Sequence, residues 1–166
     1  KEAKALGIGE LQAFFKIEGL LRKHKVTIFS SNYPLYGDIS NRVMTTLNTF
    51  SPSVEVYSID EMFLDLTGIQ EPMNSYGQRI KKTVWQHIRM PVCVGVAPSK
   101  TLAKLANKAA KTYDHCEGVC VLEEPYQWQW LQKRMPVNKV WGIGSKLTKR
   151  LAGLNIHTAY DLSRAS

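Results

Sequence analysis

Long hydrophobic runs and an even set of cysteines are both missing from this 166-residue sequence. No stretch approaches the roughly 18 apolar residues of a membrane-spanning helix, so we expect no membrane partner. The three cysteines, Cys93, Cys116 and Cys120, form no even disulfide framework, which favours a reducing, cytoplasmic setting. His115 lies next to Cys116, but a structural zinc site needs four well-spaced ligands, and we therefore expect no zinc.

An initiating methionine and a signal peptide are also missing, because the sequence starts at Lys1 with charged, helix-favouring residues. We expect the chain to be a fragment of a longer protein. A hydrophobic share of 44% predicts a packed core rather than a disordered tail. The formal net charge is +8, from 22 Lys and Arg against 14 Asp and Glu, which points to an anionic partner, nucleic acid before membrane.

Two adjacent acids, Asp60 and Glu61, lie between two apolar, strand-like runs within residues 54–66. Side chains of neighbouring strand residues point to opposite faces, so the two carboxylates can share one ion only at a turn or strand end. A paired-acid hairpin tip suits divalent cations held over phosphates. An ordinary acidic turn is the alternative interpretation, because Asp favours turns.

A helix is predicted from Ser99, its N-cap, to about Thr112. Its lysines recur at helical spacing and form one face, with apolar residues on the other sides; they are Lys100, Lys104, Lys108 and Lys111. The first of them lies where free backbone N–H groups favour an anion. The alternative is a solvated lysine face. Residues 99–101 do not form a Walker loop, because Ser99 replaces the required glycine.

Near the C-terminal end, residues 140–146 join two helical stretches through Gly142 and Gly144. Glycines permit a tight turn with bare N–H groups at the next helix start, which suits one backbone phosphate. Lys146 and Lys149 follow in the next turns. A plain helix–helix turn is the alternative interpretation.

Periodicity predicts an α+β fold, with an antiparallel sheet and helices packed on one face, of the ferredoxin-like kind. The expected helices and strands are given by residue number: helices over 2–6, 10–24, 36–50 and 80–88, and strands over 26–29, 92–97 and 118–122. A further helix contains Trp128 and Trp130. We expect both of these side chains, together with Trp85 and Trp141, to fill core positions.

Three segments in this order resemble the Y-family translesion DNA polymerases, in the UmuC-like branch. They are Tyr57–Leu66 with its Ser-Ile-Asp-Glu core, Gly95–Lys108, and Val140–Lys146 with the downstream Ile156-His157-Thr158 and Asp161-Leu162. The resemblance spans essentially the whole chain. It implies a DNA-directed DNA polymerase of SOS-type DNA repair.

By this resemblance, Asp60 and Glu61 are the catalytic acids and ligands of a two-ion Mg²⁺ site whose first Asp lies upstream of Lys1. Lys100, and Lys4 in the fingers, match positions that contact the nucleoside triphosphate. The helix-hairpin-helix residues Gly142, Gly144, Lys146 and Lys149 match a thumb module that grips primer-template DNA through phosphates.

The same resemblance implies a division into a fingers remnant (1–30), a palm (31–112) and a partial thumb with a helix-hairpin-helix (113–166). It also implies three accessory partners, namely an SOS accessory dimer, a recombinase filament and a sliding clamp. Because the first metal ligand is missing, we expect the isolated fragment to be inactive.

Two other functions stay open at this point. A nucleotidyl cyclase palm also carries an Asp-Glu hairpin, but Ser58-Ile59 replaces its Gly-Gly, and it has no need of the glycine turn. A non-catalytic duplex DNA-binding module would use that turn and the basic surface only. Dependence on magnesium separates this module from both catalytic functions.

Overall fold

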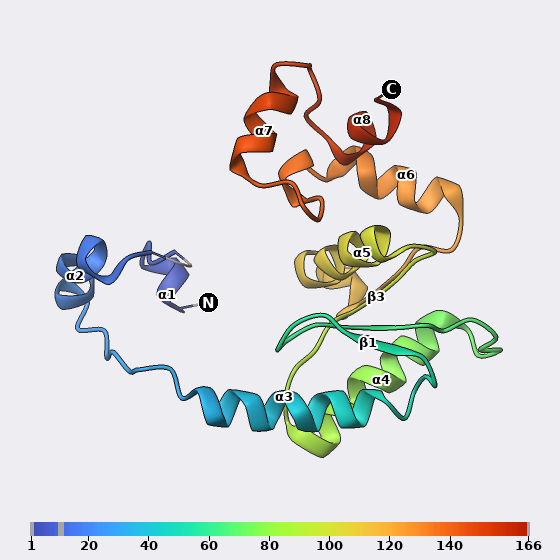
Figure 1. Ribbon diagram of the computed structural model, residues 1–166, viewed down its shortest axis with the longest axis horizontal. Coiled ribbons are helices and arrows are strands. Elements are labelled where there is room, and N and C mark those ends of the chain that lie inside the picture. Colours follow the sequence, from blue (N-terminus) through green and yellow to red (C-terminus); the bar gives the residue numbers. More distant parts are fainter. Residues whose placement is uncertain (1, 10–11, 166) are drawn as a thin grey trace. The chain divides into compact units, whose positions relative to one another are not determined.

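The computed structural model describes residues 2–9 and 12–165. The chain divides into two compact units, with the boundary between Leu35 and Tyr36 (Figure 1). The N-terminal unit contains α1 (Glu2–Ala5) and α2 (Phe14–Lys23). The predicted helix over 10–24 is thus confirmed from Phe14 onward, whereas its first residues, 10 and 11, lie outside the described part of the chain.

The predicted strand over residues 26–29 is wrong, since this segment has no regular secondary structure. Ile28 is 58% exposed and Phe29 is 84% exposed. The β propensity of branched and aromatic residues reflects packing on a pleated, half-buried surface. Among the described residues no strand pairs with this segment, so its composition alone does not produce a strand.

The second unit opens with α3 (Tyr33–Leu47, which begins just before the boundary) and the acid-bearing hairpin. Strands β1 (Val54–Val56) and β2 (Met62–Leu64) pair antiparallel, with Val54 opposite Leu64 and Val56 opposite Met62. The predicted hairpin is therefore confirmed. Its base is fastened by Ser51, whose Oγ donates a hydrogen bond to the carbonyl of Asp65 at 2.6 Å.

A second sheet follows, and its topology differs from the prediction. Helix α4 (Met73–Ile88) leads to β3 (Val94–Val96), α5 (Lys100–Thr112), the short 3-10 helix η1 (Asp114–Cys116) and β4 (Val119–Val121). Strands β3 and β4 pair parallel, as an α-helical connection between adjacent strands allows. The expected antiparallel sheet is thus wrong for this half of the fold.

Helices cover both faces of the β3–β4 ladder, rather than one face as predicted. A Cβ added at Gly95 would lie 2.2 Å from the backbone nitrogen of Asn107 on α5, so α5 lies directly on this face. A Cβ added at Gly77 on α4 would meet Val119 at 2.6 Å and Val94 at 3.6 Å, on the other face. Alternating strand residues therefore face α5 and α4 in turn, as in buried parallel sheets. Figure 1 shows α5 and α4 on either side of the strands.

The C-terminal part contains α6 (Pro125–Arg134), the 3-10 helix η2 (Val137–Lys139), α7 (Ser145–Ala152) and α8 (Ala159–Arg164). Its core is a cluster of buried side chains from α5, α6 and α8 and from the residues that directly follow β4 and α6; it consists of Leu105, Ala106, Ala109, Leu122, Leu131, Met135 and Ala159. The apolar side of α5 thus joins this part to the sheet. The α+β class and the helix-hairpin-helix region agree with the prediction.

The tryptophans differ from the expectation. Only Trp128 packs against the core, while Trp85, Trp130 and Trp141 are 46%, 45% and 37% exposed. An indole is large and amphipathic, so it often keeps one edge at the surface and uses its N–H there. Within the described residues, no helix is long and apolar enough to cross a membrane.

Candidate functional site

The two acids lie at the tip of the β1–β2 hairpin, as predicted. The backbone N–H groups of Tyr57 and Ser58 both donate to the carbonyl of Glu61 at 3.1 Å, which closes the tip. Ser40 on α3 donates from Oγ to the carbonyl of Ile59 at 2.5 Å and anchors the tip from outside. Asp60 and Glu61 are therefore presented on a short, hydrogen-bonded loop rather than on a regular strand.

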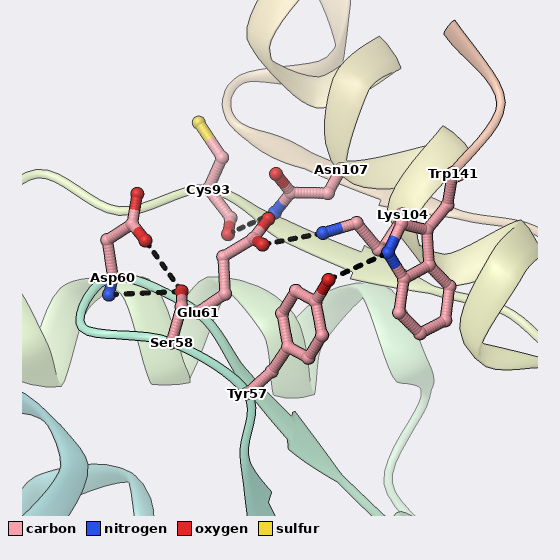
Figure 2. Close-up of polar contacts among 8 residues, drawn as sticks. All are labelled: Tyr57, Ser58, Asp60, Glu61, Cys93, Lys104, Asn107 and Trp141. Carbon is pink, nitrogen blue, oxygen red and sulfur yellow. Dashed lines mark hydrogen bonds and ion pairs between the residues drawn. The ribbon is translucent and has the colours of Figure 1, made fainter. Parts of the chain in front are cut away.

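The two carboxylates have different partners. Asp60 Oδ1 accepts a hydrogen bond from Ser58 Oγ at 2.7 Å, and Glu61 Oε2 forms an ion pair with Lys104 Nζ at 2.5 Å. Figure 2 shows the Asp60 carboxylate turned toward Ser58 and the Glu61 carboxylate turned toward α5. The second lysine of the predicted face thus contacts the acid pair directly.

Two aromatic rings complete the surroundings of Lys104. Its Nζ lies 4.7 Å from the ring centroid of Tyr57 and 5.4 Å from that of Trp141. Trp141 Nε1 donates a hydrogen bond to Tyr57 Oη at 2.9 Å, and the two rings are perpendicular with centroids 5.2 Å apart. The sequence prediction missed Trp141 as a site residue, since nothing local links it to a tyrosine 84 residues away. Its position directly before Gly142 was the one signal that the sequence offered.

Lys100, the first residue of α5, contacts a different part of the hairpin. Its ammonium pairs with Glu55 on β1 and lies 5.3 Å from the ring centroid of Phe63, rather than on Asp60 or Glu61. Ser99 caps α5 as predicted, with its Oγ accepting from the backbone N–H of Leu102. The structure therefore places Lys100 near the hairpin but separates it from the acids.

A pocket of about 170 Å³ opens beside Glu61. Its lining is mostly cationic and consists of Glu61, Lys104, Asn107, Lys108, Lys111, Lys139 and Trp141. Asn107 is held in place because its Nδ2 donates to the carbonyl of Cys93 at 2.7 Å (Figure 2). Lys108 and Lys111 thus line a pocket together with Glu61, although both side chains are exposed, as in the solvated lysine face that was the alternative.

The glycine turn precedes α7 and adopts two different backbone conformations. Gly142 has φ +88°, a left-handed conformation that favours glycine, whereas Gly144 has an ordinary φ of −86° and is the N-cap of α7. Lys146 and Lys149 are exposed on α7. Lys4 lies on α1 in the N-terminal unit, so its role stays a prediction.

Asp60 and Glu61 are suitable ligands for Mg²⁺, but they are too few to form a complete metal site by themselves. Carboxylate oxygens are the hard ligands that Mg²⁺ prefers, and both acids are at least partly exposed. Within residues 2–9 and 12–165, no group of three or more Asp, Glu, His or Cys side chains could hold a metal ion. Asp65 is engaged by Thr67, whose hydroxyl and backbone N–H hydrogen bonds lower its pKa. At the hairpin tip the described residues therefore offer two acids as possible metal ligands, Asp60 and Glu61.

Comparison with known proteins shows the family to which the chain belongs. Residues 1–108 match the impB/mucB/samB family, and residues 129–156 match the IMS family HHH motif. The chain belongs to the impB/mucB/samB family. Within it, Protein UmuC of Salmonella typhimurium is 46% identical over 168 residues, covering 99% of this chain and 40% of that protein. The resemblance to the UmuC-like branch is thereby confirmed.

Two further relatives are DNA polymerases. DNA polymerase IV of Pelotomaculum thermopropionicum is 35% identical over 136 residues, covering 78% of this chain and 32% of that protein. The solved insertion ternary complex of Dbh DNA polymerase has a TM-score of 0.82 and 30% identity, covering 99% of this chain and 47% of that one. The chain therefore spans less than half the length of each of these relatives.

Proposed function

We propose that the chain is the palm-centred part of a translesion DNA-directed DNA polymerase, with the fingers, palm and thumb boundaries predicted from the sequence. The observation that carries this proposal is the adjacent pair Asp60 and Glu61 at a hairpin tip, beside a lysine-lined pocket. Family membership and similarity to DNA polymerases support it. The glycine turn favours it over a nucleotidyl cyclase.

Asp60 and Glu61 would hold Mg²⁺ together with an acid from a preceding strand of the longer protein. When bound, the two ions would stabilise charge on the attacking and leaving oxygens of nucleotidyl transfer. The Ser58 hydroxyl orients the Asp60 carboxylate, and the closed tip holds both acids at one place. These contacts reduce the freedom that the carboxylates would lose on binding a metal ion.

Lys100 and Lys4 would bind the phosphates of the nucleoside triphosphate. Lys100 is supported by its position in the first turn of α5, where backbone N–H groups also favour an anion. It would have to leave Glu55, an exposed pair of the kind that contributes roughly 0–1 kcal/mol. The rearrangement is therefore energetically modest.

Primer-template DNA would contact the turn at Gly142 and Gly144, with Lys146 and Lys149 neutralising neighbouring phosphates. Exposed lysines and accessible backbone N–H groups at a helix start contact phosphates rather than base edges, so binding would not depend on the DNA sequence. A cytoplasmic protein acting with an SOS accessory dimer, a recombinase filament and a sliding clamp is part of the same proposal. These partners rest on the family resemblance alone.

The test is primer extension by a longer chain that also carries the upstream metal ligand. Asp60→Ala or Glu61→Ala should lower turnover by at least about 100-fold, because each removes charge stabilisation worth several kcal/mol. Asp65→Ala, which alters an acid held by Thr67, is the matched control and should change turnover little. Near-normal turnover in either acid variant would contradict the metal role. The 166-residue chain alone should incorporate no nucleotide.

A further inference from the structure

The Lys104–Glu61 ion pair is the most enclosed of those at the hairpin. The side chains of Lys104 and Glu61 are 22% and 36% exposed, against 49% and 54% for Lys100 and Glu55. A carboxylate in a pair of this kind offers fewer free lone pairs to a metal ion. A cation that takes the paired oxygen, Oε2 of Glu61, must therefore displace this ammonium.

Two aromatic rings offer the Lys104 ammonium a second set of interactions besides Glu61. The faces of Tyr57 and Trp141 lie within 5.4 Å of its Nζ, a distance at which a ring quadrupole attracts a cation. The hydrogen bond from Trp141 to Tyr57 holds the two rings at a right angle, so both faces stay available. Figure 2 shows the ammonium between the Glu61 carboxylate and these rings. Release from Glu61 would thus leave the ammonium stabilised.

From these contacts we infer that Lys104 is a positioning residue, a built-in countercharge that holds Glu61 until a divalent cation replaces it. This inference rests on the metal role proposed above for Asp60 and Glu61. On metal binding, the Lys104 ammonium leaves the carboxylate and rests on Tyr57 and Trp141. Trp141 directly precedes Gly142, so one of the two rings lies next to the glycine turn in the sequence.

The test measures binding of Mn²⁺ alone to the 166-residue chain, by the loss of the electron paramagnetic resonance signal of free Mn²⁺. Lys104→Gln keeps most of the side-chain length and removes the charge, so it should tighten Mn²⁺ binding about threefold to fivefold. Lys104→Arg, which keeps the charge, should not tighten it. Lys108→Gln is the matched control, because it removes a charge from the same pocket that is not paired with Glu61.

The outcomes separate the two proposals. Mn²⁺ binding that Glu61→Gln leaves unchanged would overturn the metal role of the acids and this inference with it. Binding that depends on Glu61 but is equal in Lys104→Gln and Lys108→Gln would overturn the countercharge alone. Unfolding of the variants is followed by circular dichroism. If Lys104→Gln fails to fold, Lys104→Met takes its place with the same expected tightening.

A second readout follows the tryptophans. Added Mg²⁺ should change the emission of the wild-type chain and of Trp85→Phe, but not that of Trp141→Phe or Lys104→Gln. Trp85 is a suitable control because it also lies beside a cation, with Arg89 at 5.7 Å from its ring centroid. An emission change that persists in Trp141→Phe would contradict the resting place on Trp141.

Discussion

The close approach of β3 to α5 makes Gly95→Ala the most demanding test of the fold that positions the site. An added Cβ would lie 2.2 Å from the backbone nitrogen of Asn107 and 2.3 Å from the carbonyl oxygen of Ala103. Atoms in contact prefer separations near 3.5 Å, so strand and helix would have to move apart by roughly 1 Å. Both clashing atoms belong to the helix backbone, and no side-chain rotation relieves them.

The magnitude follows from this geometry. Overpacking in a core costs about 1–3 kcal/mol, and a clash with backbone belongs at the upper end. In a chain of this size, a loss of about 3 kcal/mol lowers the melting temperature by roughly 6–12 °C. Because α5 also carries Lys104, the same displacement should weaken the ion pair with Glu61.

Thermal unfolding followed by far-ultraviolet circular dichroism measures the effect. Gly37→Ala is the matched control, since Gly37 lies within α3 and an added Cβ would meet nothing within 4 Å. Alanine is the better helix former, so this variant should be stabilised by about 0.5–1 kcal/mol. A Gly95→Ala chain that melts within about 2 °C of the wild type would refute the packing of β3 against α5.

Three further predictions concern DNA, nucleotide and acid. Gly142→Ala should destabilise the chain by about 1 kcal/mol, because Gly142 has a left-handed φ. Gly144→Val should leave folding intact and weaken duplex binding, measured by fluorescence anisotropy at several salt concentrations. Equal binding by both variants and the wild type would contradict the turn as a phosphate contact. Lys100→Ala in the longer chain should raise the apparent KM for nucleotide at least about threefold, by loss of a charge-assisted contact, whereas the exposed Lys82→Ala should not; similar KM values would leave Lys100 a surface charge. Backbone N–H groups of Thr158 and His157 lower the pKa of Asp161 below 3.8. The stabilising effect of this carboxylate is therefore present above that pH and is lost as the pH falls through the lower pKa of the folded state. The melting temperatures of the wild type and Asp161→Asn should differ at about pH 6 and converge near about pH 2, and a constant difference would argue against the capping carboxylate.

Local features of the fold were predictable from the sequence, because their causes lie within a few residues. The hairpin around Asp60 follows from two apolar runs about one turn, and the start of α5 follows from Ser99 as an N-cap. The lysine face of α5 follows from its spacing alone. These elements depend on short-range periodicity, which tertiary packing here reinforces.

Long-range features were not predictable in the same way. An apolar run such as residues 92–97 reads alike in a parallel or an antiparallel sheet, so the partner of β3 depended on where α5 directs the chain. Likewise, the pairing of Lys104 with Glu61 rather than with solvent, and of Trp141 with Tyr57, joins segments 43 and 84 residues apart. The site was therefore predicted as an acid pair, and its cationic and aromatic surroundings were found only in the structure.

The parallel pairing of β3 with β4 also has a consequence during synthesis on the ribosome. The β1–β2 hairpin is complete once residue 64 has been made, whereas β3 ends at residue 96 and its partner ends only at residue 121. At a synthesis rate of roughly 5–20 residues per second, β4 is completed about one to five seconds after β3. Helix α5 is made in this interval and can cover one face of β3 through Gly95, so the order of the chain shields a strand whose edge is still open.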